Sequence, residues 1–266
     1  MTPEALAALC DVAMPEEHLQ VDELTRICFG EGDEVVGDEH AAAVYTTKAF
    51  GDYVAAWLLL VAVAPDAQGR GAGKELVRQV CDRARPRGAR SMHLANAVPR
   101  YVWPGVEIAN TRAGMLFETL GFTPDLVGVN MAIPTTFRHE APPGVHVERE
   151  RGDGAIAFAA REYPHWVEEL SCAIANGTAF AARKEGGSTI GFACHSVNRR
   201  AWIGPMATEA TRQHGGVGSA LLAAVCADLA GEGAATGEIA WVSNQRFYGK
   251  CGATVSRVFQ GGRLDL

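Results

Sequence analysis

The chain has 266 residues, of which 48% are hydrophobic, and it carries a formal net charge of -7 at pH 7. This length and apolar content suffice for two cores of ordinary size, so we expect two domains. The acidic balance argues against nucleic-acid binding through a basic face and would suit a small cationic substrate. No apolar run of about eighteen residues and no leader-like start occurs, so we expect a cytoplasmic protein that does not enter a membrane.

The cysteines also limit the possibilities. There are seven, an odd number, and none is spaced as CxxC. Most have apolar neighbours, which favours buried free thiols over a disulfide framework or a zinc site. The sequence therefore predicts no metal cofactor.

In the first half of the chain, hydrophobic periodicity predicts one or two helices over 2–29, and the acidic segment 30–39 is expected to be a loop. Strands are predicted at 41–46, Tyr53–Val63, 91–98 and 126–133, and helices at 74–85 and 111–120. The polar segment 137–144 contains two prolines and is the expected linker. It would separate a domain over 1–137 from a second domain over 144–266.

The second half repeats this order of elements. The predicted elements are a strand at 145–149, helices at 153–163 and 166–175, a hairpin over 178–196, a strand at 201–208, a helix at 218–230, a strand at 238–242, a short helix at 245–250 and a strand at 255–259. Pro205 lies within one of these strands and cannot donate to its ladder, which predicts a bulge there.

Each half contains a strand, a glycine-rich loop and a helix in direct succession. The pattern Gln-x-x-Gly-x-Gly begins at Gln68 in the first half and at Gln213 in the second. Glycine lets the backbone approach a ligand closely, and amides at a helix start attract a phosphate or pyrophosphate. Two copies of one such unit indicate a duplication.

A second pair of matching segments lies downstream of the two loops. The first reads NTRAGMLFETLGF and the second NQRFYGKCGA. When they are aligned on the glycine that ends each helix, Leu116 stands opposite Phe247 and Phe117 opposite Tyr248. The two copies are therefore related but not equivalent.

This constellation resembles the GCN5-related N-acetyltransferase (GNAT) family, in two tandem copies that cover nearly the whole chain. The resemblance implies an α/β (α+β) fold of two tandem acyl-CoA N-acyltransferase domains, each a mixed, mostly antiparallel sheet flanked by helices. Acetyl-CoA would lie between two splayed strands, its pyrophosphate on the loop amides and its pantetheine arm along a strand edge. The residues so implied are Val61, Ala62, Val63, Gln68, Gly69, Arg70, Gly71, Ala72, Gly73, Lys74, Asn110, Met206, Ala207, Thr208, Gln213, His214, Gly215, Gly216, Val217, Gly218, Ser219 and Asn244. The two asparagines equally suit helix N-caps.

Acetyl transfer to an amine requires a proton for the departing thiolate. Tyr248 matches the tyrosine that serves the family as this acid, and a phenol with a pKa of about 10 stays protonated at neutral pH. Phe117 has no such proton, so we expect the second domain to catalyse. The first would be structural, bind coenzyme, or use another donor. Glu238 and His195 are the candidates for a general base acting through water, although either also suits a surface or packing role.

The sequence thus predicts an acetyl-CoA-dependent N-acetyltransferase acting on a primary amine, with a small molecule favoured as acceptor, as a monomer or homodimer. The alternative is an acyl-CoA-binding or sensing protein without turnover. A Rossmann site would need the full G-x-G-x-x-G, which neither loop has. An ATP-type loop would need a glycine where Gln68 stands and Ser or Thr where Glu75 stands.

Overall fold

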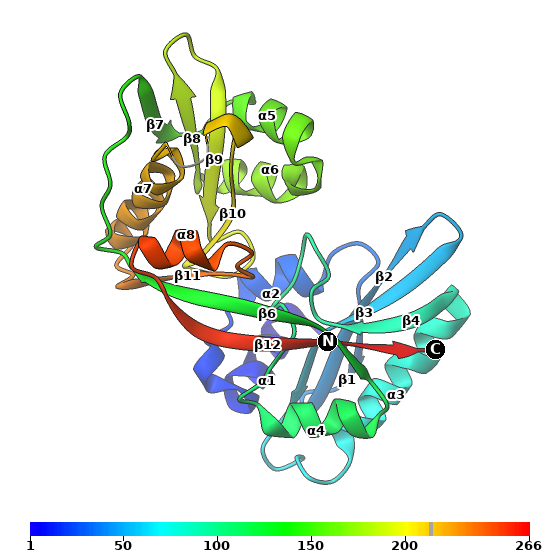
Figure 1. The fold of residues 1–266 in the computed structure, drawn as a ribbon. Helices are drawn as coiled ribbons and strands as arrows, with labels where there is room; N and C mark the ends of the chain where they lie inside the picture. The colour runs from blue at the N-terminus through cyan, green and yellow to red at the C-terminus, as the bar shows by residue number, and fades with distance from the viewer. Residues whose placement is uncertain (213–214) are drawn as a thin grey trace. The chain divides into compact units, whose positions relative to one another are not determined.

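The chain forms two compact units in the computed structural model, which describes residues 1–212 and 215–266. Unit 1 comprises Met1–Gly128 together with Val258–Leu266, and unit 2 comprises Val129–Arg257. Figure 1 shows the course of the chain through both. Each unit is a mixed α/β fold in which helices flank a mostly antiparallel sheet, as the sequence predicts.

Unit 1 is built on antiparallel strands β1, β2 and β3, followed by β4 parallel to β3 and β12 antiparallel to β4. Its described elements are α1 (Pro3–Ala13), α2 (Val21–Cys28), β1 (Glu34–Gly37), β2 (Ala41–Phe50), β3 (Tyr53–Val63), α3 (Ala72–Ala84), β4 (Ala89–Leu94), β5 (Val106–Glu107), α4 (Thr111–Thr119) and parts of β6 (Thr123–Pro134) and β12 (Thr254–Asp265).

The sheet of unit 1 is covered on both faces because its strands are apolar on both sides. Along β2, Ala42 and Val44 pack with the leucines of α1 and α2, whereas Ala43 and Tyr45 pack with α3. Successive side chains of a strand point to opposite faces, so an unbroken apolar run needs helices on both. This explains why the predicted central strand β3 lies between two helical layers.

The expectation of a loop over 30–39 is wrong, because β1 lies within this segment. Val36 is buried and pairs with β2. The acidic neighbour Glu34 is held by ion pairs with Arg83 and Arg87 at 2.6 and 2.7 Å. Cations from elsewhere in the unit thus let an acidic sequence form a strand.

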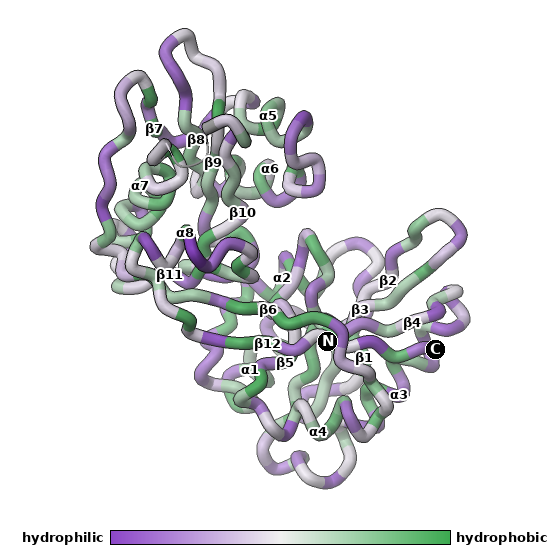
Figure 2. The backbone as a smooth tube through the Cα atoms, in the orientation of Figure 1, coloured by the Kyte–Doolittle hydropathy of each residue, from purple (hydrophilic) through white to green (hydrophobic). Residues whose placement is uncertain are grey.

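Unit 2 repeats the arrangement, with β7, β8, β9 and β10 antiparallel, β11 parallel to β10, and β6 antiparallel to β11. Its elements are β7 (Val145–Arg149), α5 (Gly154–Glu162), α6 (Val167–Asn176), β8 (Ala179–Lys184), β9 (Thr189–His195), β10 (Trp202–Thr208), α7 (Val217–Gly231), β11 (Thr236–Ile239) and α8 (Gln245–Lys250). The helices α5 and α6 cover one face and α7 the other. Figure 2 shows few hydrophilic residues along α7, as expected of a helix buried on most sides.

Two strands are exchanged between the repeats. The end of β12, the last strand of the second repeat, belongs to unit 1, and the end of β6, the last strand of the first repeat, belongs to unit 2. The end of β12 pairs with β4, for example Leu264 with Met92, and β6 pairs with β11, for example Ile133 with Gly237. The predicted strand over 255–259 is correspondingly too short. The compact units therefore differ from the sequence repeats, which we divided at 137–144.

The cysteines are free thiols, and most are buried, as the apolar neighbours predict. Burial raises the pKa of the Cys10 thiol to about 12 and that of Cys226 to about 11. Both therefore stay protonated at neutral pH and act as small apolar side chains.

Candidate coenzyme and catalytic site

The parallel strands β3 and β4 of unit 1 separate part-way along β3. Leu58 pairs with Leu94, and the amide of Ala95 donates to the Leu58 carbonyl at 2.9 Å. There β4 ends, whereas β3 continues to Val63 alongside β2. Within 1–212 and 215–266, no strand pairs with this edge of β3 beyond Leu58. The predicted coenzyme segment 61–63 thus lies on an open edge.

Unit 2 repeats this separation between β10 and β11. Ile203 pairs with Ile239, where β11 ends, and β10 runs on beside β9. The register between β10 and β9 shifts between Ile203 and Met206, which confirms the bulge predicted from Pro205. The predicted segment 206–208 lies beyond this point, again on a strand edge without a described neighbour on that side.

Glycines with positive φ carry the chain from each strand into its helix. Gly69 and Gly71 have φ of +73° and +88°, and Gly216 has φ of +84°. Gly71 and Gly216 are the N-caps of α3 and α7, so each loop turns directly into a helix start. Of the other predicted loop residues, Gln213 and His214 lie outside the described residues.

The last glycine of the first motif lies where three elements meet. A side-chain carbon added to Gly73 would be 3.3 Å from Cδ2 of Leu116 and 3.7 Å from Cγ2 of Val63. These atoms belong to α4 and to the end of β3. Glycine at this position therefore lets α3 begin against both elements.

The second motif makes the same contacts. A carbon added to Gly218 would be 3.2 Å from Cζ of Phe247, on α8, and 3.9 Å from Cγ2 of Thr208, at the end of β10. Phe247 thus occupies the place that Leu116 occupies in unit 1, which confirms the alignment made from the sequence. The duplication extends to individual contacts.

Gln68 fastens the first loop to its neighbours. Its Nε2 donates to the Val63 carbonyl at 2.9 Å, and its Oε1 accepts from Nη1 of Arg112 at 2.8 Å. Arg112, on α4, was not identified from the sequence. Together with Arg70 and Lys74 it gives the first loop and its helices three cationic side chains.

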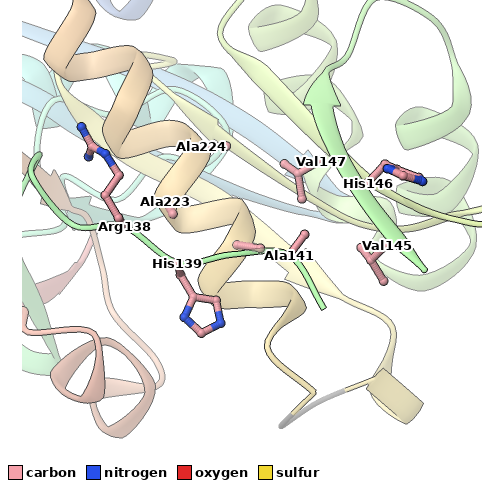
Figure 3. A pocket seen from close by; sticks show the side chains of 9 residues that line it. Arg138, His139, Ala141, Val145, His146, Val147, Ala223 and Ala224 are labelled. Carbon is pink, nitrogen blue, oxygen red and sulfur yellow. The ribbon is translucent and has the colours of Figure 1, made fainter. Parts of the chain in front are cut away.

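Two residues that sequence reasoning missed contact the strand end and the helix start on either side of the second loop. The hydroxyl of Tyr163 donates to the Thr208 carbonyl at 2.9 Å. A carbon added to Gly216 would be 3.2 Å from Nε2 of His139, so this linker residue lies against the start of α7. His139 also lines an adjoining hollow of about 400 Å³. Figure 3 shows the side chains around it. The hollow is lined by Arg138, His139, Ala141, Val145, His146, Val147, Ala220, Ala223 and Ala224.

Tyr248 lies on α8 beside Phe247, with the two ring centres 4.9 Å apart. The side chain is half-buried against the core that α7 shares with the sheet. Among the described residues its hydroxyl has no hydrogen-bond partner. Burial, with a smaller contribution from Cys251, raises the pKa of the phenol above its ordinary value. It therefore keeps its proton at neutral pH.

The equivalent residue of unit 1 has a different environment. Phe117 is buried and packs edge-on against Phe122, with ring centres 5.4 Å apart. Its ring carries no proton that a thiolate could accept. The two units thus share a frame but differ at this side chain.

The two predicted asparagines both cap helices. Oδ1 of Asn110 accepts from the amide of Ala113 at 3.1 Å, and Oδ1 of Asn244 accepts from the amide of Phe247 at the same distance. Both side-chain oxygens therefore act as helix N-caps. Contact of either residue with a pantetheine arm stays a prediction.

Of the two candidate bases, Glu238 lies at the point where the strands separate. It pairs with Trp202, one residue before the last paired position of β11. The side chain is half-buried, and its Oε1 accepts from Nδ2 of the buried Asn130 at 2.5 Å. The backbone of Glu238 is thus at the apex of the splay, while its carboxylate is held by a side chain of β6.

His195 ends β9 opposite Ile203 of β10, but its ring is directed to α7. It is fully buried, with Nε2 2.8 Å from Oδ2 of Asp228 and Nδ1 3.1 Å from Oγ of Ser196. Asp228 follows Gly218 on α7 by ten residues, or about 15 Å of helix. The structure thus places the His195 ring against the far half of α7 rather than near the glycine loop.

The same splayed strands, glycine turns and short helices therefore occur twice. The model of the Acetyltransferase (GNAT) family matches residues 12–122 and 145–253. The chain belongs to the GNAT family. Each match includes one copy of the splayed strands, the glycine loop and the short helix of this GNAT protein.

Several solved structures share the fold. A GCN5-related glucosamine N-acetyltransferase region of a fungal multi-domain GH3 β-N-acetylglucosaminidase aligns with a TM-score of 0.77 and 18% identity, over 98% of this chain and 37% of that chain. A tandem GNAT protein from the clavulanic acid biosynthesis pathway aligns with a TM-score of 0.74 and 11% identity, over 99% and 94%. A GCN5-related N-acetyltransferase from Sphaerobacter thermophilus aligns with a TM-score of 0.67 and 18% identity, over 100% of this chain and 94% of that chain. At these identities the likeness concerns the fold.

No curated protein matches this GNAT chain. Within the part of the chain that is described, none of the helices combines the length and apolar character needed to cross a membrane.

Proposed function

We propose that this GNAT protein transfers an acetyl group from acetyl-CoA to a primary amine of a small molecule, with Tyr248 as the general acid. The observation that carries the proposal is the position of α8, the short helix that bears Tyr248. Tyr248 follows Phe247, whose ring lies against Gly218 at the start of α7, and α7 starts beside the open end of β10. Tyr248 is thus on the short helix whose Phe247 contacts the start of α7 beside the predicted coenzyme edge, which supports the proposal.

The chain's own groups fit the coenzyme. The open edges at 61–63 and 206–208 offer backbone groups to a pantetheine amide, as an added strand would pair. The glycine turns at the starts of α3 and α7 offer amides and the positive helix end to a pyrophosphate. These contacts need no particular side chain, which supports coenzyme binding in both units.

The proposed reaction is a direct transfer. The amine nitrogen attacks the thioester carbonyl, a C–N bond forms, and the C–S bond breaks. Glu238 receives the proton of the amine through a water molecule, and the Tyr248 hydroxyl gives its proton to the departing thiolate. Glu238 is favoured over His195 because the His195 ring is directed to α7 and hydrogen-bonded to Asp228.

Unit 1 is proposed to bind coenzyme without turnover. It has the open strand edge, the glycine turn and the nearby cations Arg70, Lys74 and Arg112. Phe117 supplies no proton at the position of the acid. A phosphate-bearing ligand would be favoured there by charge, independently of any chemistry.

The acceptor is proposed to be a small cationic amine, in keeping with the net charge of -7. A cytoplasmic location and a monomeric or homodimeric state stay predictions. The alternative, an acyl-CoA-binding or sensing protein without turnover, is favoured by the same backbone features. It differs only in giving Tyr248 and Glu238 no chemical role.

The deciding experiment measures thiol release from acetyl-CoA with a panel of small amines, alongside calorimetric titration of the coenzyme. We expect thiol release with at least one amine. Tyr248→Phe should lower turnover by about 100-fold, the effect of losing a general acid, with coenzyme affinity unchanged. Wild-type turnover in this variant would remove Tyr248 from the mechanism. Tight coenzyme binding without thiol release from any amine would establish the alternative instead.

A further inference from the structure

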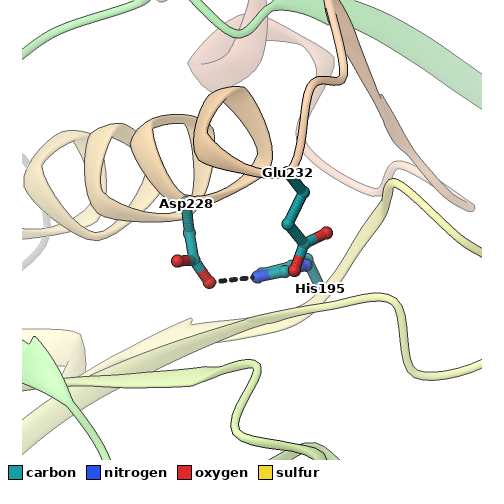
Figure 4. Close-up of side chains that lie close together, drawn as sticks. All are labelled: His195, Asp228 and Glu232. Carbon is teal, nitrogen blue, oxygen red and sulfur yellow. Dashed lines mark hydrogen bonds and ion pairs between the residues drawn. The ribbon is translucent and has the colours of Figure 1, made fainter.

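One imidazole and two carboxylates converge at the C-terminal half of α7. His195 is the last residue of β9, and Asp228 and Glu232 are four residues apart at the end of α7, so they project from one side of the helix. One ligand atom from each lies within 4.8 Å of the others. Figure 4 shows the three side chains turned toward one another.

Outer contacts fix the two inner residues of this cluster. Nδ1 of His195 lies 3.1 Å from Oγ of Ser196, and Oδ1 of Asp228 accepts from the guanidinium of Arg149. Arg149 also donates to a backbone carbonyl and lies over the Phe180 ring at 4.8 Å. Nε2 of the imidazole and Oδ2 of Asp228 are thereby turned inward. Metal-binding histidines and carboxylates are oriented by such outer hydrogen bonds.

Glu232 differs from its neighbours because it is exposed, and among the described residues its carboxylate has no hydrogen bond or ion pair. It nevertheless points to the same imidazole as Asp228. Two carboxylates four residues apart on a helix repel each other unless a cation lies between them. Arg149 approaches only Asp228, and from the side away from the His195 nitrogen. A positive charge between the three groups would relieve this repulsion.

We propose that His195, Asp228 and Glu232 bind one divalent transition metal ion of the zinc type, with water completing the coordination. A nitrogen and two carboxylate oxygens are a donor set for Zn²⁺, Co²⁺ or Ni²⁺, whereas Mg²⁺ and Ca²⁺ prefer oxygen ligands alone. Ligand atoms of such an ion lie about 3.5 Å apart at bond lengths of about 2.1 Å. Nε2 of His195 and Oδ2 of Asp228, 2.8 Å apart in a hydrogen bond, would separate to about this spacing as the metal replaces the shared proton. The exposed Glu232 side chain can rotate toward them and leaves the ion a path from solvent.

The two carboxylates lie at the opposite end of α7 from the glycine loop, so the metal would tie the end of α7 to β9. The site also differs from the expectation of no metal, which rested on the cysteine spacing. His195 is 33 positions before Asp228 in the sequence, and no short motif joins them. Only the fold brings the two together.

Calorimetry on chelator-treated full-length protein, titrated with Zn²⁺ or Co²⁺ and no acyl donor, tests the proposal. We expect one ion per chain, a higher thermal unfolding midpoint, and a Co²⁺ visible spectrum without sulfur charge-transfer bands. Glu232→Gln should lower the affinity at least about 10-fold, the scale of losses at metal sites. Glu185→Gln, at an exposed acid on the turn after β8, is the matched control and should bind as wild type.

Two results would overturn the assignment. One is no saturable binding of either ion by the wild-type protein. The other is equal affinity in the wild type and Glu232→Gln, because Glu232 is exposed and its amide variant should fold normally. Asp228→Asn gives a second measurement: it should also lower the affinity, and unaltered binding in this variant would contradict the ligand set.

Discussion

Truncation of Glu150 to alanine should strongly destabilise unit 2, because this carboxylate holds the start of α5. It is 1% exposed and accepts hydrogen bonds from the amides of Arg151, Gly152 and Ala155 at 3.0, 2.8 and 3.1 Å. Nη2 of Arg183 adds an ion pair at 2.7 Å. Removal of one partner from a buried ion pair costs about 3–5 kcal/mol. We expect about 3 kcal/mol, since water can reach the freed amides at the helix start.

Glu148→Ala is the matched control, because Glu148 also binds Arg183 but its side chain is 61% exposed. An exposed ion pair contributes about 0–1 kcal/mol. Urea unfolding at neutral pH, followed by circular dichroism, compares the two variants with the wild type. A loss below about 1 kcal/mol for Glu150→Ala, or equal losses in both variants, would refute the role assigned to burial.

The loss of unfolding free energy in Glu150→Ala should depend on pH. Burial raises the pKa of Glu150, but the hydrogen bonds from Gly152 and Ala155 and the Arg183 guanidinium outweigh it and hold the pKa below its ordinary value. The stabilisation is therefore complete above the unfolded pKa of about 4.3 and is lost as the pH falls through the lower folded pKa. The difference between wild type and Glu150→Ala should shrink in acid, and a constant difference would contradict this account.

Two further predictions concern the coenzyme frame. Gly71→Ala should cost about 1–2 kcal/mol of stability from its positive φ alone, because nothing lies within 4 Å of an added carbon. Gly216→Ala should cost more, since His139 Nε2 would be 3.2 Å away, and urea unfolding that gave the reverse order would contradict this contact. Tyr163→Phe removes the hydrogen bond to Thr208 and should weaken coenzyme binding about fivefold without lowering kcat. Calorimetry and steady-state kinetics separate these two effects, and a fall in kcat alone would count against it.

Periodicity predicted most elements closely, and β3, β7 and α8 have the bounds expected from the sequence. The failures have local causes. The acidic segment around β1 hid a strand whose one carboxylate, Glu34, is paired with the distant Arg83 and Arg87. Gly261 and Gly262 hid the end of β12, since glycine usually weakens strands. Here added side chains would approach Asp125 and Leu94 within 2.5 and 2.9 Å, so the close packing requires glycine.

The residues of the candidate site also fall into those that the sequence could identify and those that it could not. The glycine turns and Tyr248 belong to contiguous motifs, so the sequence could point to them. Arg112, His139 and Tyr163 contact their loops or strand ends from remote segments, and no spacing links them. Contacts of this kind depend on how elements pack, which a single sequence does not record.

The two units differ at the positions where the proposed acid and base stand. At the apex of the splay, Trp57 pairs with His93 in unit 1, and Trp202 pairs with Glu238 in unit 2. Burial lowers the pKa of His93, against the opposing effect of Asp125, so this imidazole is neutral at pH 7. Backbone amides and open strand edges work with almost any side chain, so both copies can keep a coenzyme frame after duplication. A catalytic acid or base, in contrast, is lost when its side chain is replaced by one that cannot exchange a proton. Coenzyme binding is therefore the proper measurement for unit 1 and turnover the proper measurement for unit 2.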